Sequence, residues 1–162
     1  MKIVYAREPL PTSIFLAGPT PRDPETESWR PEAIELLKIH GFQGTVYVPE
    51  DRDQVAKFNY DDQINWEWNA LESSSTILFW VPREMKSMPA LTTNVEFGLY
   101  VKSGRVLLGY PLTAEKNKYL DALASRFSVP VYHDLEDLIK ATLWRMGHGR
   151  PAGSYDKVVN ID

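Results

Sequence analysis

The residues best suited to do chemistry lie within residues 92–98, whose sequence is TTNVEFG. This stretch comes between an apolar run that ends at Pro82 and an amphipathic segment that continues to Lys102. A carboxylate placed there would lie on the first turn of a helix at the mouth of a sheet, where α/β proteins hold their ligands. We therefore predict that Glu96 is the principal catalytic residue.

The same residues also fit a helix cap. In a Thr93-x-x-Glu96 capping box the Thr93 hydroxyl accepts a hydrogen bond from the Glu96 amide, and the Glu96 side chain accepts one from the Thr93 amide. Caps occur on most helices, whereas catalytic carboxylates occur on few. A helix N-terminus would also favour the ionised form of Glu96 by roughly 0.3–1 kcal/mol, which suits either interpretation.

Polar side chains elsewhere are further candidates for binding a ligand. Gln63 and Glu67 are four residues apart and therefore share one face of a predicted helix. Gln63 and Asn94 could hydrogen-bond a ligand, although exposed amides are common. Arg22 or Arg83 could bind a phosphate, because arginine holds phosphate through two parallel hydrogen bonds.

Length and composition narrow the class of protein. A chain of 162 residues fits one domain with a substantial core. It has no cysteine, which excludes disulfides and thiolate metal sites and suits a reducing compartment. No apolar stretch approaches the ~20 residues needed to cross a bilayer, and the apolar start is too short for a signal peptide. We expect a soluble, cytoplasmic protein.

The partner expected from charge and motifs is a small molecule. The net charge is −4 and no Lys/Arg block stands out, which argues against a nucleic acid polymer. Neither GxGxxG, GxxxxGKS/T nor GxSxG occurs, so dinucleotide, ATP and serine-hydrolase sites lack support. His40, His133 and His148 have no metal-ligand spacing and no thiol partners, so we expect no metal and no cofactor.

Hydrophobic periodicity predicts five strands and five helices in alternation. The strands are apolar runs that stop at turn residues, and we place them at residues 12–17, 45–48, 76–81, 105–110 and 130–132. The helices are placed at residues 28–40, 59–73, 115–127 and 134–146, with one more that contains Glu96 and ends near Ser103. Ile64, Trp68 and Leu71 mark the buried face of the second helix, and Asp134 caps the last one.

This alternation predicts an α/β fold, a single-domain, doubly wound, five-stranded parallel sheet of flavodoxin or Rossmann type. Residues 1–148 are assigned to this domain, with residues 2–5 as an edge strand or strap. Residues 149–162 form a polar tail that is either disordered or packed on a neighbouring subunit. The carboxyl edge of the sheet would gather the loops at residues 18–24, 49–53 and 82–92. The charged loop at 49–53 is interpreted as a solvated connection without a role.

Three segments resemble the nucleoside 2-deoxyribosyltransferase superfamily, which includes the 2′-deoxynucleoside 5′-phosphate N-hydrolases. They are residues 14–19 (IFLAGP) at the first strand end, residues 76–82 (TILFWVP) after a helix, and residues 94–98 (NVEFG) at the opening of the next helix. The resemblance runs from about Ile14 to Tyr110. Its order of elements agrees with the predicted fold.

The resemblance implies roles for particular residues. In this superfamily the glutamate of a small-x-Glu-x-Gly motif attacks the anomeric carbon, and Glu96 matches it. The first strand and its glycine loop line the sugar and base site, which maps onto Phe15, Gly18 and Arg22. An acidic residue on the second helix, which fixes the sugar or moves protons, maps onto Glu67.

The chain also departs from the superfamily. Transferases of this kind have an aspartate about six residues before the nucleophile, where it handles the leaving base, but residues 90–93 are ALTT. The base would then take its proton from elsewhere or from water. The side chains that suggest a distinct branch with its own substrate are Gln63, Trp66, Glu67, Trp80, Arg83, Thr92, Thr93 and Asn94. Phe15, Trp66 and Trp80 are stacking candidates for the base, unless they are ordinary core residues.

We therefore expect an enzyme that acts on the N-glycosidic bond of 2′-deoxynucleosides and transfers the deoxyribosyl group between bases through Glu96, without a cofactor. Two alternatives remain, an N-glycoside hydrolase of (deoxy)nucleoside 5′-monophosphates and a catalytically silent nucleotide-sensing module. Because members of the superfamily assemble as oligomers, the resemblance also implies a homo-oligomer.

Overall fold

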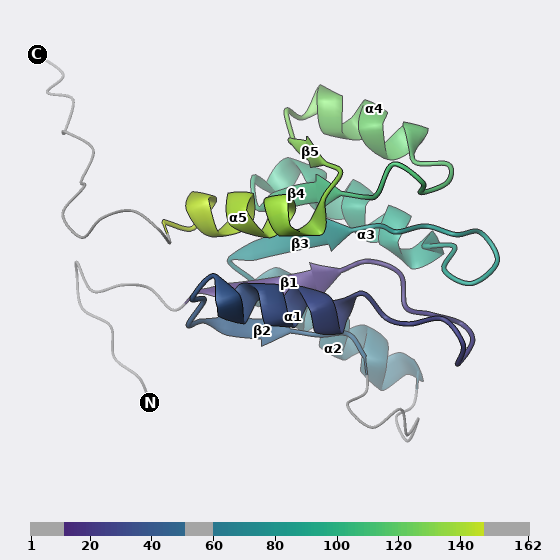
Figure 1. The fold of residues 1–162 in the computed structure, drawn as a ribbon, viewed down its shortest axis with the longest axis horizontal. Helices are drawn as coiled ribbons and strands as arrows, with labels where there is room; N and C mark the ends of the chain where they lie inside the picture. The colour runs from purple at the N-terminus through teal and green to yellow at the C-terminus, as the bar shows by residue number, and fades with distance from the viewer. Residues whose placement is uncertain (1–11, 51–59, 148–162) are drawn as a thin grey trace, which may run out of the picture.

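The computed structural model describes residues 12–50 and 60–147, which form a five-stranded sheet between two layers of helices (Figure 1). All neighbouring strands pair in parallel, in the order β2-β1-β3-β4-β5. The predicted α/β fold is confirmed. The strands are β1 (Ser13–Ala17), β2 (Thr45–Tyr47), β3 (Thr76–Trp80), β4 (Val106–Gly109) and β5 (Val131–Tyr132).

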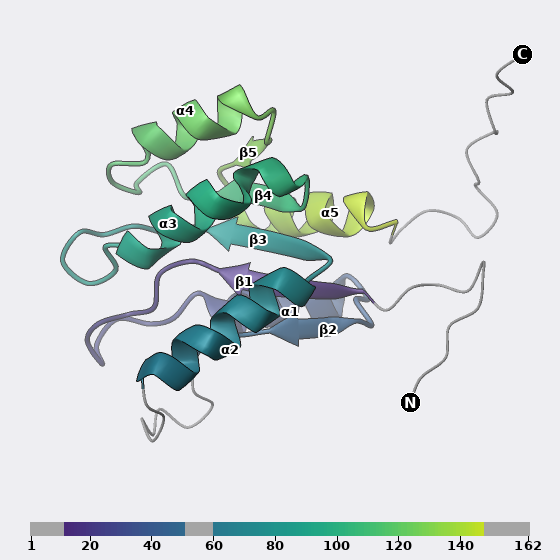
Figure 2. The ribbon, with the colours of Figure 1, turned by 180° about the vertical axis from the view of Figure 1, so that it is seen from behind.

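The helices cover both faces of the sheet. One face carries α1 (Arg30–Ile39) and α5 (Leu135–Arg145). The other face, seen in Figure 2, carries α2 (Tyr60–Ser73), α3 (Leu91–Tyr100) and α4 (Lys118–Arg126). None of the described helices is long and apolar enough to cross a membrane.

The two cores arise because side chains alternate along each strand. In β3, Ile77 and Phe79 point to the layer of α2, α3 and α4, whereas Leu78 and Trp80 point to the layer of α1 and α5. Every residue of β1 and β3 is buried. This explains why both strands read as continuous apolar runs, since a central parallel strand is covered on both sides.

The order of the strands creates a topological switch point between β1 and β3. These strands are neighbours in the sheet although β2 lies between them in the sequence. The chain therefore crosses toward β2 after β1 and toward β4 after β3. The two connections diverge at the carboxyl ends of β1 and β3. Ligands of open α/β sheets bind in the crevice at such a point.

Helix α3 begins earlier than the sequence suggested. Ala90 adopts a left-handed conformation with φ of 58°, the helix starts at Leu91, and no side chain caps it. Thr93 and Glu96 therefore lie inside the helix, and the capping-box interpretation is wrong. The prediction that Glu96 lies on the first turn is wrong as well. The field of a helix N-terminus falls off within the first turn, so it does not account for the ionisation of Glu96.

Helix α2 is rotated relative to the predicted face. Trp68 is 58% exposed, whereas Ala70 and Leu71 are buried, so the placement of Trp68 on the buried face was wrong. The cap on α5 is confirmed, because the Asp134 carboxylate accepts a hydrogen bond from the Asp137 amide at 2.9 Å. The predictions for residues 2–5, residues 51–53, His148 and the 149–162 tail lie outside the described residues.

Candidate active site

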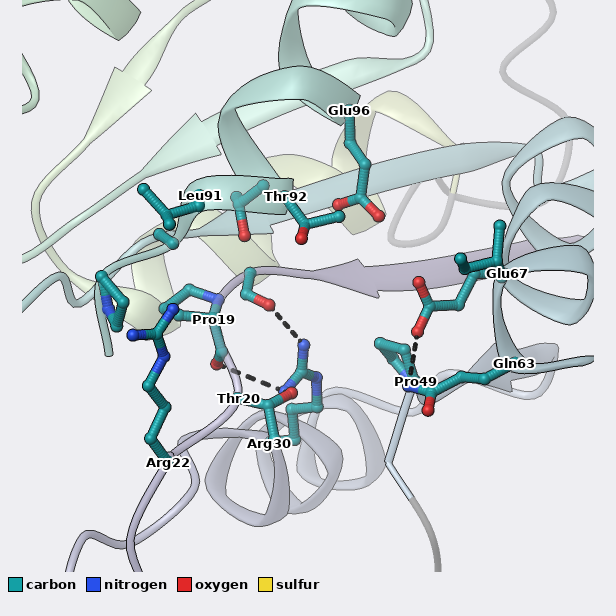
Figure 3. Close-up of a pocket in the computed structure, with 15 residues that line it drawn as sticks. Pro19, Thr20, Arg22, Arg30, Pro49, Gln63, Glu67, Leu91, Thr92 and Glu96 are labelled. Atoms are coloured by element: carbon teal, nitrogen blue, oxygen red, sulfur yellow. Dashed lines mark hydrogen bonds between the residues drawn. The ribbon is translucent and has the colours of Figure 1, made fainter. Parts of the chain in front are cut away.

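A pocket of about 230 Å³ lies at the switch point, at the carboxyl edge of the sheet. It is formed by the loop after β1, the start of α1, the residue Pro49 after β2, the first half of α2, and the loop and helix that follow β3 (Figure 3). Its lining residues are Gly18, Pro19, Thr20, Arg22, Arg30, Pro49, Gln63, Ile64, Glu67, Pro89, Ala90, Leu91, Thr92, Thr93 and Glu96.

Two carboxylates face this pocket from different helices. Figure 3 shows Glu96 reaching down from α3 and Glu67 reaching in from α2, so that both side chains end in the same cavity. Burial, and secondly the negative charge of Glu67, raise the pKa of Glu96 to about 7, while the positive charge of Arg30 opposes the shift. Near neutral pH, Glu96 can therefore change between its acid and carboxylate forms.

Glu67 is oriented by a neighbour on its own helix. The Gln63 amide nitrogen donates a hydrogen bond to the Glu67 carboxylate at 2.9 Å. The two residues are one turn apart, as their spacing predicted, and both line the pocket. Gln63 thus restricts the rotamer of the second carboxylate.

The loop after β1 passes close to the sheet because it begins with glycine. A Cβ atom at Gly18 would lie 2.1 Å from the backbone oxygen of Trp80, so no other residue fits without moving the chain. The Trp29 indole donates to the carbonyl of Pro19 at 3.2 Å. The Arg22 amide donates to the carbonyl of Ser87 at 3.0 Å, which joins this loop to the one after β3.

Six of the predicted site residues line the pocket together, although their segments are distant in the sequence. They are Gly18, Arg22, Gln63, Glu67, Thr93 and Glu96. The structure therefore brings the proposed nucleophile, the second carboxylate and the glycine loop to one place.

The aromatic candidates do not line the pocket. Phe15 and Trp80 are buried in opposite cores, on the two faces of the sheet. Trp66 is partly exposed on α2, with its ring centroid 6.5 Å from that of Phe15 and 6.4 Å from that of Tyr47. Phe15, Trp66 and Trp80 are therefore absent from the pocket lining.

Arg83 and Asn94 lie together on the other side of α3. The Arg83 guanidinium is buried, and it donates to the Asn94 side-chain oxygen and, at 2.9 Å, to the carbonyl of Lys116. Asn94 precedes Glu96 by two residues, which is a rotation of about 200° around a helix. The two side chains therefore connect α3 to the loop after β4 and are absent from the pocket lining.

The sequence pattern assigns no role to Arg30 or Glu50, which form an ion pair at the pocket. Arg30 is the first residue of α1 and lines the pocket, and Glu50 in the loop after β2 pairs with it at 2.5 Å. A usable signal for Arg30 was present, because a cation in the first turn of a helix opposes the helix dipole. The residues that hold it lie in other segments, and no local pattern points to them.

The donor set of the pocket favours acid–base or nucleophilic chemistry. It combines two carboxylates, an amide, two guanidinium groups and three threonine hydroxyls. Among residues 12–50 and 60–147, no three His, Cys, Asp or Glu side chains are grouped so that they could hold a metal ion. Most glycoside hydrolases use a pair of carboxylates that flank the substrate, and this pocket is lined by two.

Comparison with known families supports this interpretation of the site. A family model described as "Nucleoside 2-deoxyribosyltransferase like" matches residues 11–113. The matched segment runs from β1 to just beyond β4 and includes every residue that lines the pocket. The resemblance seen in residues 14–110 is thereby confirmed. A comparison with curated proteins finds no match.

Proposed function

The chain belongs to the nucleoside 2-deoxyribosyltransferase-like family, and from this premise we propose that it cleaves the N-glycosidic bond of 2′-deoxynucleosides and transfers the deoxyribosyl group between bases. The observation that carries the proposal is the partly buried Glu96 carboxylate, which faces Glu67 in the pocket at the switch point. The proposal assigns Glu96 as the nucleophile and Glu67 as the group that holds the sugar or moves a proton.

The reaction would proceed in two displacements at the anomeric carbon. In the first, a Glu96 oxygen bonds to C1′ as the C1′–N bond breaks, and the base leaves with the electron pair of that bond. In the second, the nitrogen of an acceptor base bonds to C1′, the ester bond breaks, and Glu96 returns as a carboxylate. Both transition states resemble an oxocarbenium ion. A 2-deoxy sugar reaches that state more readily, because it lacks an electron-withdrawing 2′-hydroxyl.

Proton transfer distinguishes this chain within the family. Ala90 occupies the position six residues before Glu96, so no carboxylate stands there to protonate the leaving base. Ala90 lines the pocket, which leaves room beside the base. The base therefore takes its proton from water or from Glu67, and the acceptor base releases one to solvent in the second displacement.

The decisive experiment is a chromatographic assay. The protein is incubated with a panel of 2′-deoxynucleosides and their 5′-monophosphates, with and without a free acceptor base. We expect new nucleoside that requires the acceptor. Free base alone would show hydrolysis, and no turnover across a broad panel would favour a silent nucleotide-sensing module.

A hydrolase that acts on nucleoside 5′-monophosphates is the second candidate, favoured by Arg22 in the pocket lining. If Arg22 binds the 5′-phosphate, we expect Arg22→Gln to raise KM for monophosphates by about tenfold or more, the worth of a charge-assisted pair. Unphosphorylated nucleosides should be unaffected. The matched control is Arg126→Gln, an exposed arginine on α4. An equal effect of Arg22→Gln on both substrate classes would contradict a phosphate site.

We further propose that the chain forms a homo-oligomer through the outer face of α3. Leu91, Val95 and Leu99 follow one another at four-residue spacing and are each at least 60% exposed. A contiguous exposed apolar stripe of this kind is a feature of protein–protein contact surfaces. Leu91 also lines the pocket, so a subunit placed on this stripe would border the site.

The double variant Val95→Glu/Leu99→Glu tests this interface. We expect its mass in solution, measured by light scattering after size exclusion, to fall to that of one chain, because two carboxylates would be buried at the contact. The variant should still fold, since both side chains are exposed on the single chain. Leu112→Glu, at a position that is 82% exposed outside α3, is the control and should keep the native mass. A wild-type protein that is monomeric at all concentrations would exclude the interface.

A further inference from the structure

Arg30 is a fully buried cation whose role the proposed reaction leaves open. Only 1% of its side chain is exposed, although it stands at the edge of the pocket. Its guanidinium donates to the end of β1 and to the loop that follows this strand (Figure 3). The acceptors are the carbonyls of Leu16 at 3.1 Å, Gly18 at 2.7 Å and Pro19 at 3.4 Å, and the Thr20 hydroxyl at 3.1 Å.

Glu50 holds Arg30 from the opposite side. Its carboxylate pairs with the guanidinium at 2.5 Å and accepts hydrogen bonds from the Ser28 hydroxyl at 2.9 and 3.0 Å. The Ser28 hydroxyl in turn accepts from the Arg30 amide at 3.2 Å. This closed network joins the loop after β1, the start of α1 and the loop after β2, the three segments that form one side of the pocket.

The stability of the fold alone does not explain why the Arg30–Glu50 ion pair is buried. A buried ion pair often contributes no more than apolar residues of the same volume, because both charges lose their hydration. Burial lowers the pKa of Arg30 even though Glu50 opposes the shift. The cation also stands in the first turn of α1, where the helix dipole disfavours it. Desolvation and the helix dipole thus both oppose a positive charge at this place beside the pocket.

Among the described residues, several charged or titratable groups lie around Glu96. Glu67 approaches it from α2, and Arg22 lines the same pocket from the loop after β1. Tyr100 follows it along α3 and interacts with it electrostatically. The positive charge of Arg30 favours the carboxylate form of Glu96, whereas the negative charge of Glu67 disfavours that form. Glu50 lies behind the guanidinium, outside the pocket lining.

We propose that Arg30, braced by Glu50, is a positioning residue that fixes the Gly18–Thr20 wall of the pocket and supplies a positive charge that favours the carboxylate form of Glu96. The consequence for turnover rests on the proposed function. The effect on the ionisation of Glu96 does not rest on that function, because this ionisation can be measured without any substrate.

The test is an NMR titration of the Glu96 carboxyl carbon in the wild type, Arg30→Gln and Arg30→Lys. We expect Arg30→Gln to move the midpoint upward by about one pH unit, the lower end of the effect of a nearby opposite charge. Arg30→Lys keeps the charge but cannot span the loop carbonyls. Its midpoint should stay close to that of the wild type, while its turnover falls because the wall is no longer fixed.

Arg105→Gln is the matched control for lost packing. Its guanidinium also binds backbone carbonyls, those of Leu71 at 2.9 Å and Ser74 at 2.6 Å, but at the opposite edge of the sheet. We expect it to lower the melting temperature without moving the Glu96 midpoint. If Arg30→Gln fails to fold, Arg30→Gln/Glu50→Gln removes both buried charges and should still raise the midpoint.

The outcomes separate this inference from the proposed function. An unchanged Glu96 midpoint in the folded Arg30 variants, or an equal shift in Arg105→Gln, would overturn the positioning role even if the enzyme transfers deoxyribose. If the Glu96 midpoint shifts in a protein that turns over no nucleoside, the electrostatic role of Arg30 is supported and the proposed reaction is excluded.

Discussion

Glu96→Gln is expected to lower the rate of deoxyribosyl transfer by roughly 10³-fold or more, about 4 kcal/mol in the activation free energy. Glutamine keeps the size of the side chain, but its amide cannot form the glycosyl ester on which the second displacement depends. The measurement is single-turnover release of base from a 2′-deoxynucleoside. Binding of that nucleoside, followed by calorimetry, should weaken by no more than a few-fold.

The stability of the same variant distinguishes a catalytic glutamate from a structural one. Since Glu96 lies within α3 and caps nothing, Glu96→Gln should fold with an unfolding free energy at least equal to that of the wild type at pH 8. Gln63→Ala, which removes another pocket residue, serves as the control for general damage to the site and should reduce turnover far less. A variant of Glu96 that retained its turnover would remove the nucleophile assignment.

The second large effect is on the pH dependence of turnover. Because the pKa of Glu96 is about 7, we expect the first displacement to slow tenfold for each pH unit below 7 and to level off above it. An ordinary glutamate would remain ionised down to about pH 4.3. The single-turnover rate measured from pH 5 to pH 9 checks this, and a plateau that extended down to pH 5 would contradict it.

Glu67→Gln gives this prediction an internal control. Glu67 is the second cause of the raised pKa of Glu96, after burial. Its neutral analogue should therefore move the midpoint of the pH profile toward lower pH, opposite to the shift expected for Arg30→Gln. Opposite shifts from the two substitutions would follow from charge and could not arise from general loosening of the pocket.

The same pKa also sets a pH dependence of stability, whose sign follows from linkage. The folded-state pKa of about 7 lies above the usual value of 4.5, so the folded protein holds the proton more tightly than the unfolded chain. The resulting stabilisation is fully present below pH 4.5 and is lost as the pH rises toward 7. Its size is at most about 3 kcal/mol. Urea unfolding of the wild type and Glu96→Gln across this range should show the difference between them growing in favour of the variant.

The sequence by itself determined the sheet and the family. Apolar runs such as residues 76–81 are long enough for a strand buried on both faces, and the alternation of these runs with helices allows few topologies. Parallel strands bring their carboxyl ends to one edge, so the loop at Gly18 and the helix of Glu96 could be placed together before their contacts were known. The cap at Asp134 could also be predicted, because its partner, the Asp137 amide, is only three residues away.

Only the tertiary structure decided which side of each helix meets the pocket. A shift of one residue turns a side chain by about 100°, which separates Glu67 in the pocket from Trp68 in solvent, and two residues separate Glu96 from Asn94. The left-handed Ala90 moved the start of α3 and with it the place of Glu96 in the helix. Arg30 and Glu50 are 20 residues apart, and the contact between them exists because β1 and β2 are neighbours in the sheet. A local sequence pattern cannot predict such a contact, because the contact depends on how the elements pack and not on the residues next to either partner.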